Sequence, residues 1–129
     1  MAGRLRASVA VFAMVASGAA TLTLADGEMI FEPGEGSFNW DSYDAYAASH
    51  DLSGQNITVF GPWLAGEGQA FENLMAYFGA ATGAGWSYVG SDSLEQQIVI
   101  DAEAGSAPDI TVFPQPGLAA NMAARGFLT

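Results

Sequence analysis

The strongest constraint on the fold is an alternation of short apolar runs with helix-like segments in the second half of the chain. The runs cover 57–60, 86–89 and 110–113, are rich in β-branched and aromatic residues, and each is followed by Gly or Pro. A segment with apolar residues at helical spacing follows each run. Strands joined by helices pair in parallel, because each crossover returns the chain to the same end of the sheet. The sequence therefore predicts an α/β fold, a parallel βαβαβα unit over 55–129.

The predicted helices carry recognisable faces and ends. The first has an apolar face at positions 0, 3, 4 and 7, made of Phe71, Leu74, Met75 and Phe78. Thr82-Gly83 is typical of its C-terminal end. Either Asp92, or Ser93 together with Gln96, is expected to cap the second helix. Apolar stripes are predicted for the second and third helices, with Leu94, Ile98 and Ala102 on one and Leu118 and Met122 on the other.

The N-terminus has the pattern of a secretory signal peptide. Arg4 and Arg6 precede an uncharged apolar stretch that ends in small residues. We predict that residues 1–25 are removed, with cleavage after Ala25, or alternatively after Ala20. The apolar part is too short to span a membrane comfortably. No Cys is present to carry a lipid, so a periplasmic protein without stable membrane insertion is expected.

The charge balance excludes several functions. The chain has 14 acidic and 3 basic residues, a net charge of −11, and no Cys or Lys. All the acids lie at or after Asp26, and Arg125 is the only basic residue beyond the predicted signal peptide. A nucleic-acid binder needs a basic surface, and an anionic membrane would repel this chain. A phosphate-binding P-loop needs a Lys that is absent here.

Residues 26–54 differ from the rest of the chain. They are polar and Gly-rich, are interrupted by aromatic residues, and include one short predicted helix over 41–49. A segment of this length cannot build its own core. We expect an N-terminal arm that packs onto the α/β unit.

Three loops follow the predicted strands, at 61–69, 90–93 and 114–117. In parallel α/β sheets, ligands bind beyond the carboxyl ends of the strands. The candidate ligand-binding residues are Trp63, Asp92, Ser93 and Gln115. Trp63 can stack on a sugar ring or pack as core, and Gln115 can bind hydroxyls or face solvent. Asp92 and Ser93 can bind hydroxyls or serve as helix caps.

No catalytic, metal-binding or cofactor-binding residue is expected. His50 is the only His, and no Ser stands in the G-x-S-x-G pattern. The Gly66-x-Gly68 pair lacks the third Gly or Ala of a dinucleotide fingerprint. The alternating Asp or Asn residues, the Gly and the closing Glu of a calcium-binding loop are also absent from the sequence.

Several motifs together resemble the extracellular solute-binding proteins of family 1. These are G-S-A-P-D-I-T-V-F over 105–113, F-G-A-A-T-G over 78–83 and A-R-G-F-L over 124–128. With G-P-W over 61–63 and S-D-S-L-E-Q-Q over 91–97, the chain looks most like the α-glucoside-binding branch. The resemblance implies a periplasmic receptor that binds a sugar and serves the permease subunits of an ABC importer. It implies a two-lobe fold and no enzymatic activity.

The same resemblance implies that the chain is an N-terminal fragment, with 55–129 as the beginning of the first lobe. The third helix has no return strand, which leads to the same expectation. The alternative is the N-terminal part of a secreted hydrolase whose catalytic residues lie beyond residue 129. A hinge and a second βα lobe in the longer reading frame would favour the receptor, and a nucleophile motif would favour the enzyme.

Export gives the first testable prediction. The periplasmic form should begin at or near Asp26, because Ala25 ends the small-residue cleavage pattern. N-terminal sequencing of protein released by osmotic shock measures this directly. Recovery of a chain with an intact Met1 in the membrane fraction would contradict it.

Overall fold

The computed structural model describes residues 27–129. The predicted signal peptide, with its two alternative cleavage sites, lies outside these residues. Within the described part, four helices and three strands follow one another along the chain. They are α1 (Trp40–Ser49), β1 (Asn56–Gly61), α2 (Ala65–Thr82), β2 (Gly85–Gly90), α3 (Leu94–Ala104), β3 (Ile110–Thr111) and α4 (Pro116–Ala124).

The three strands form one parallel sheet in the order β2-β1-β3. β1 is central, and its whole length pairs with β2, from Asn56 opposite Gly85 to Gly61 opposite Gly90. β3 pairs with β1 through Ile110 opposite Val59 and its neighbour. The predicted α/β class and the parallel βαβαβα order are therefore confirmed. Since the strands are parallel and in register, their carboxyl ends lie at one edge of the sheet.

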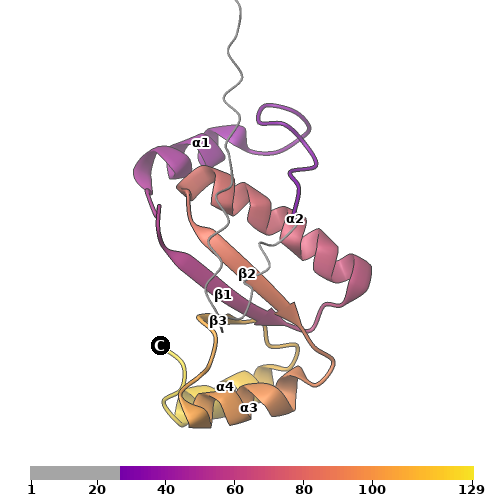
Figure 1. Ribbon diagram of the computed structural model, residues 1–129, viewed down its shortest axis with the longest axis vertical. Coiled ribbons are helices and arrows are strands. Elements are labelled where there is room, and N and C mark those ends of the chain that lie inside the picture. The colour runs from indigo at the N-terminus through magenta and orange to yellow at the C-terminus, as the bar shows by residue number, and fades with distance from the viewer. Residues whose placement is uncertain (1–26) are drawn as a thin grey trace, which may run out of the picture.

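Helices cover both faces of this sheet. Figure 1 shows α1 and α2 on one side and α3 and α4 on the other. The α3–α4 side holds the buried cluster of the described residues, made of Phe60, Leu94, Ile98 and Met122. Leu94, Ile98 and Met122 are each no more than 2% exposed, so the predicted apolar stripes of these two helices are confirmed. Burial of side chains this large contributes about 1.5–3 kcal/mol each.

The α2 side is packed by aromatic rings. Phe71 of α2 lies against Tyr88 of β2, with ring centroids 4.8 Å apart. α2 ends at Gly83, whose φ of 74° is left-handed and whose N–H donates to the Gly79 carbonyl at 2.8 Å. The predicted Thr82-Gly83 end is therefore confirmed, because only Gly adopts this conformation without strain.

Three expectations need correction. Leu74 was placed on the apolar face of α2, yet it is 62% exposed, because α2 packs through its neighbouring residues. The strand expected over 110–113 has only two ladder residues, although the Val112 N–H still donates to the Phe60 carbonyl at 2.9 Å. The loop expected over 61–69 stops at Leu64, because the Gly-rich stretch that follows it forms the first turns of α2.

The N-terminal arm lies along α2. The Glu28 N–H donates to the Asn73 side chain at 3.0 Å, and the Phe31 N–H donates to the Tyr77 hydroxyl at 2.7 Å. The Tyr43 hydroxyl of α1 donates to the Tyr77 carbonyl at 3.2 Å. These bonds attach the arm and α1 to the α/β unit at several points.

A side-chain clamp holds β3 beside β1. The backbone N–H and the hydroxyl of Thr58 both donate to the Asp109 carboxylate, at 2.8 and 2.7 Å. The Asp109 N–H donates back to the Thr58 hydroxyl oxygen at 3.0 Å. The carboxylate accepts from the Thr58 N–H as a strand carbonyl would, so it extends the β1–β3 pairing by one step. This geometry gives a physical role to the Asp of the 105–113 motif.

The clamp predicts an acid-sensitive contribution to stability. Hydrogen bonds from the Thr58 side chain and backbone lower the pKa of Asp109 below its usual 3.8. A group with a lowered folded-state pKa stabilises the fold above its unfolded pKa, and this contribution disappears as the pH falls through the folded pKa. Asp109→Ala should therefore lower the Tm at pH 7, and the difference from the wild type should shrink in strong acid.

Thermal unfolding from pH 7 downwards measures this difference. Glu95→Ala is the matched control, because Glu95 is exposed and its side chain forms no hydrogen bond within residues 27–129. A Tm difference for Asp109→Ala that is absent at pH 7, or constant down to pH 2, would contradict a role for the ionised clamp.

Candidate ligand site

The carboxyl ends of β1 and β2 bring two of the predicted loops into direct contact. The Ser91 N–H donates to the Gly61 carbonyl at 3.0 Å, one step beyond the paired strands. A Cβ placed on Gly90 would lie 2.0 Å from the Trp63 carbonyl oxygen, so only Gly fits here. The β1–α2 and β2–α3 loops therefore pack backbone to backbone at this edge.

Trp63 lies two residues beyond β1 and is partly buried. Its ring packs against Phe71 of α2, with centroids 5.1 Å apart, and lies 6.5 Å from the Tyr88 ring. The Trp63 ring thus packs in part as a core side chain. A cavity of about 190 Å³ lies beside it, lined by Gln69, Glu72 and the loop itself.

The hydroxyl of Tyr88 fixes the backbone of Trp63. It accepts from the Trp63 N–H and donates to the Trp63 carbonyl, both at 2.9 Å. Burial raises the pKa of Tyr88, and the nearby Glu72 and Glu67 carboxylates raise it further. Sequence reasoning missed this residue, since Tyr88 read only as a strand residue. The usable signal is that Tyr88 shares a sheet face with Gly61, which leaves room for its ring.

Asp92 and Ser93 are exposed in the turn between β2 and α3. Ser93 stands at the N-cap position, but its side chain does not cap the helix. Its hydroxyl donates to the Asp92 carboxylate at 3.1 Å instead, and its N–H donates to the Ser91 hydroxyl at 3.1 Å. The expected capping by Asp92 or Ser93 was wrong, because the hydroxyl is used as a donor to a carboxylate.

Gln115 is exposed and precedes α4, with Pro116 at the first helical position. No hydrogen bond among residues 27–129 joins its side chain to Trp63, Asp92 or Ser93. The structure therefore brings the first two loops together and places Gln115 at the same sheet edge without a contact to them.

The helix N-termini at this edge share one property. α2, α3 and α4 all begin without a side-chain cap, behind Leu64, Ser93 and Gln115. By contrast α1, which does not follow a strand, is capped by Asn39, whose side chain accepts from the Ser42 N–H at 3.0 Å. First-turn N–H groups without a cap can donate to ligand oxygens.

The first residue of α2 is strained. Ala65 has a φ of 48° and is the only non-Gly residue with positive φ in the described part of the chain. A left-handed non-Gly residue costs on the order of 1–3 kcal/mol and concentrates at functional loops. This strain lies two residues after Trp63 and was not foreseen from the sequence.

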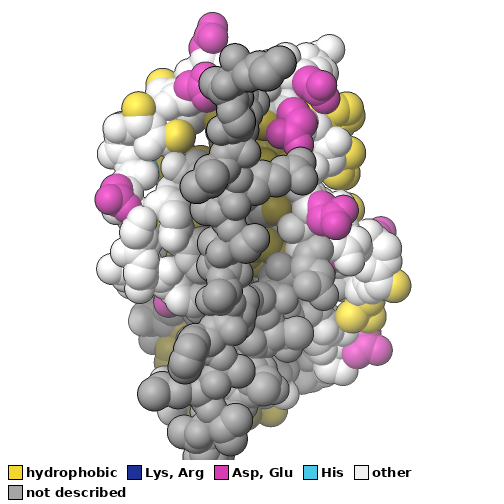
Figure 2. Space-filling view, turned by 45° about the horizontal axis from the view of Figure 1, so that its top comes forward, with side chains coloured by type: hydrophobic (Ala, Val, Ile, Leu, Met, Phe, Trp, Pro, Cys, Tyr) yellow, Lys and Arg dark blue, Asp and Glu magenta, His cyan; other side chains and the backbone are white. Residues whose placement is uncertain are grey.

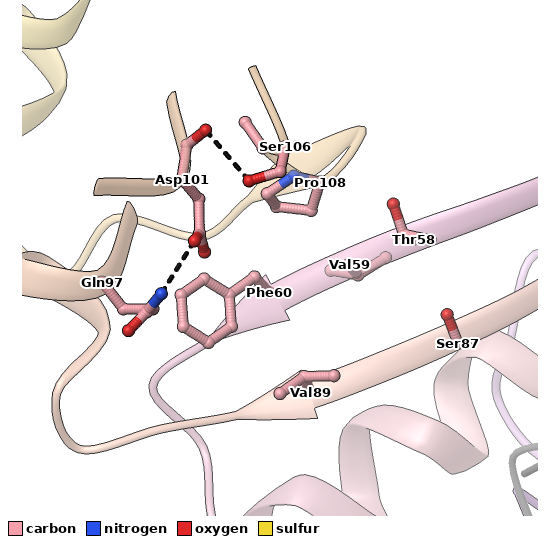
Figure 3. A pocket seen from close by; sticks show the side chains of 10 residues that line it. Thr58, Val59, Phe60, Ser87, Val89, Gln97, Asp101, Ser106 and Pro108 are labelled. Atoms are coloured by element: carbon pink, nitrogen blue, oxygen red, sulfur yellow. Dashed lines mark hydrogen bonds between the residues drawn. The ribbon is translucent and has the colours of Figure 1, made fainter. Parts of the chain in front are cut away.

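A second cavity, of about 440 Å³, lies between β1, β2 and α3 and contains none of the predicted residues. Figure 3 shows Phe60 and Val89 on its strand side, with Gln97 and Asp101 projecting from α3. Most of its polar groups are already bonded within the protein. Gln97 donates to the Asp101 carboxylate at 2.7 Å, and the Ser106 hydroxyl donates to the Asp101 carbonyl at 3.3 Å. The strand ends, by contrast, carry three helix N-termini whose first-turn N–H groups have no side-chain cap.

Comparison with known proteins finds sequence similarity to two binding proteins. The chain is 50% identical over 103 residues to the alpha-glucosides-binding periplasmic protein AglE of Rhizobium meliloti (strain 1021). It is 35% identical over 78 residues to the osmoprotective compounds-binding protein GgtB of Synechocystis sp. (strain ATCC 27184 / PCC 6803 / Kazusa). The chain is a homologue of solute-binding proteins.

The matched segments cover 79% and 60% of this chain, but only 22% and 18% of the two solute-binding relatives. The chain thus spans about a fifth of the length of the curated relatives that it matches. No family model matches it, and no solved structure gives a significant match. Among residues 27–129, no helix is both long and apolar enough to cross a membrane.

The contact between the first two loops predicts that substitutions at two glycines, Gly90 and Gly117, differ sharply in their effect on stability. Gly90→Ala should destabilise the fold by about 1–3 kcal/mol, because its Cβ would overlap the Trp63 carbonyl. Gly117→Ala, in the first turn of α4, is the control. Its Cβ would meet nothing within 4 Å, so the change should gain up to about 1 kcal/mol.

Urea unfolding of both variants gives the free energies. Equal stability of Gly90→Ala and the wild type would show that the two loops do not pack as described.

Proposed function

We propose that this chain contributes to the substrate-binding component of an ABC importer. The component binds a carbohydrate, an α-glucoside, in the periplasm and delivers it to the membrane permease. In this proposal residues 1–25 are the signal peptide, 26–54 the arm and 55–129 part of the first α/β lobe. The ligand lies at the carboxyl ends of β1, β2 and β3.

The observation that carries the proposal is the set of uncapped helix N-termini at one sheet edge. α2, α3 and α4 all begin there without a side-chain cap, next to Trp63 and the exposed side chains of Asp92, Ser93 and Gln115. A parallel sheet that ends in open helix termini is the usual place for a ligand. The similarity to AglE, which is named as an alpha-glucosides-binding protein, supports the choice of ligand.

The chemistry of this edge suits a neutral, hydroxyl-rich ligand. Asp92 accepts from hydroxyls, Gln115 both donates and accepts, and the part of Trp63 left exposed can cover the apolar face of a sugar ring. The net charge of −11 disfavours anionic ligands such as phosphates and dicarboxylates.

Binding without catalysis is part of the proposal. Both relatives are named as binding proteins. His50 lies at the end of α1, where its ring stacks on Tyr46 with centroids 4.0 Å apart and Nδ1 lies 2.9 Å from the Ser49 hydroxyl. It belongs to the arm and not to the loops at the strand ends.

The test is calorimetry with α-glucosides on the complete gene product that carries this chain. Trp63→Ala should weaken binding by about 1–3 kcal/mol, roughly 5- to 150-fold, which is the scale of a buried aromatic contact. Trp40→Ala, a Trp of the arm, is the matched control and should leave the sugar affinity unchanged.

Because Trp63 also packs on Phe71, a second variant separates binding from folding. Gln115→Ala removes an exposed side chain and should weaken sugar binding without lowering the Tm, whereas Gln96→Ala on α3 should change neither. Unchanged affinity in both site variants, or a preference for anionic ligands, would refute the proposed site.

A further inference from the structure

A third, chemically different pocket lies between the arm, α1 and α2. It has a volume of about 250 Å³ and is lined by Phe38, Asn39, Trp40, Tyr43, Leu74 and Tyr77. Figure 1 shows α1 lying beside α2 on the face of the sheet opposite α3 and α4. The pocket is therefore built from elements that do not carry the proposed sugar-binding loops.

The aromatic rings of this pocket form one continuous group. Trp40 is its centre, with ring centroids 5.6 Å from Phe38, 5.4 Å from Tyr43 and 6.1 Å from Tyr77. Tyr43 and Tyr77 are themselves 6.5 Å apart and nearly perpendicular. Rings in different orientations thus line one small volume, and the face of each aromatic ring is negatively polarised.

The polar atoms of these rings are already used inside the protein. Trp40 Nε1 donates to the Glu35 carbonyl at 2.7 Å, and the Tyr43 hydroxyl donates to the Tyr77 carbonyl. The Tyr77 hydroxyl accepts from the Phe31 N–H and donates to the Phe31 carbonyl at 3.1 Å. The pocket thus offers ring faces and Leu74, but few donors or acceptors. A sugar, which needs hydrogen bonds to its hydroxyls, is a poor fit.

The apolar wall of the pocket is open to solvent. Phe38 is 55% exposed and Leu74 is 62% exposed. Both residues line the same cavity, so its wall is an apolar surface that a ligand can reach from solvent.

The surroundings of the pocket are acidic. Residues 27–49, which supply the arm and α1, contain five acids and no Lys or Arg; the acids are Glu28, Glu32, Glu35, Asp41 and Asp44. Figure 2 shows Asp and Glu side chains scattered over the visible face, with no Lys or Arg visible on it. Burial raises the pKa of Tyr43, and the charge of Asp44 raises it further, so this carboxylate acts on the ring system.

The aromatic lining and the acidic surroundings together favour a ligand that is positively charged and has an apolar surface. Anions are repelled, and a compact, strongly hydrated ammonium would lose its water without gaining hydrogen bonds here. A methylated ammonium has a spread positive charge and an apolar surface, and aromatic faces attract it through cation–π interactions. We propose that this pocket binds the methylated ammonium group of a small organic cation.

Choline and its uncharged isostere 3,3-dimethylbutan-1-ol test the proposal, since they share a shape and differ in charge. Calorimetric titration of the whole chain should show choline binding about 2- to 30-fold more tightly, the range expected for exposed to desolvated cation–π contacts. Equal or tighter binding of the isostere would show that the pocket recognises only apolar surface, and it would overturn the proposal.

Two variants separate the charge from the fold. Asp44→Asn keeps the size of an exposed side chain and should weaken choline binding while leaving the isostere unchanged. Glu95→Gln, an equally exposed acid on α3, should change neither. Trp40→Leu keeps an apolar wall but removes the central ring, and it should abolish the preference for choline. A preference that survives both Asp44→Asn and Trp40→Leu would refute the assignment.

The trimethylammonium group also occurs in lipid headgroups, so a vesicle assay assigns its source. Sedimentation with phosphatidylcholine vesicles, competed by choline, would assign the pocket to a lipid headgroup. Choline binding without sedimentation would assign it to a free solute. Absence of both would refute the proposal. Because α-glucoside affinity is not used, failure here leaves the proposed sugar site untouched.

Discussion

The central position of β1 is the constraint on which the rest of the structure depends. Its backbone pairs with β2 on one side and with β3 on the other, while the Thr58–Asp109 clamp extends the second pairing. Because both partners run parallel to β1, the loops that follow β1, β2 and β3 all leave from the same edge of the sheet. The helices that follow the strands then begin at that edge. The location of the candidate ligand site is therefore a consequence of strand direction before any side chain is considered.

Much of this was predictable from local patterns. Short β-branched runs bounded by Gly and Pro gave the strands, and the 3.6-residue period gave the buried stripes of Leu94, Ile98 and Met122. The predictions failed where tertiary contacts decide between local alternatives. Leu74 fits a helical apolar face, but α2 packs through its neighbouring residues and leaves Leu74 62% exposed. Ser93 reads as a cap, but its hydroxyl donates to the neighbouring carboxylate.

The site was only partly predictable for the same reason. The strand-end rule located the loops, and residue chemistry selected Trp63, Asp92, Ser93 and Gln115. What the sequence could not reveal is how Trp63 is held, because Tyr88 lies 25 positions away and meets it only after β1 and β2 pair. The left-handed Ala65 was equally invisible, since Ala has no intrinsic preference for that conformation. The aromatic pocket of the arm was missed because its rings come from two segments more than 30 residues apart.

The double hydrogen bond from Tyr88 has a consequence for motion. The Trp63 amide belongs to a loop, yet its partner is a hydroxyl carried by a paired strand. Loop amides usually exchange with solvent through small local openings, while strand amides wait for larger cooperative ones. In this chain the Trp63 N–H is open to exchange only when its bond to the Tyr88 hydroxyl breaks. The backbone of the loop that faces the candidate ligand is therefore anchored to β2 before any ligand arrives.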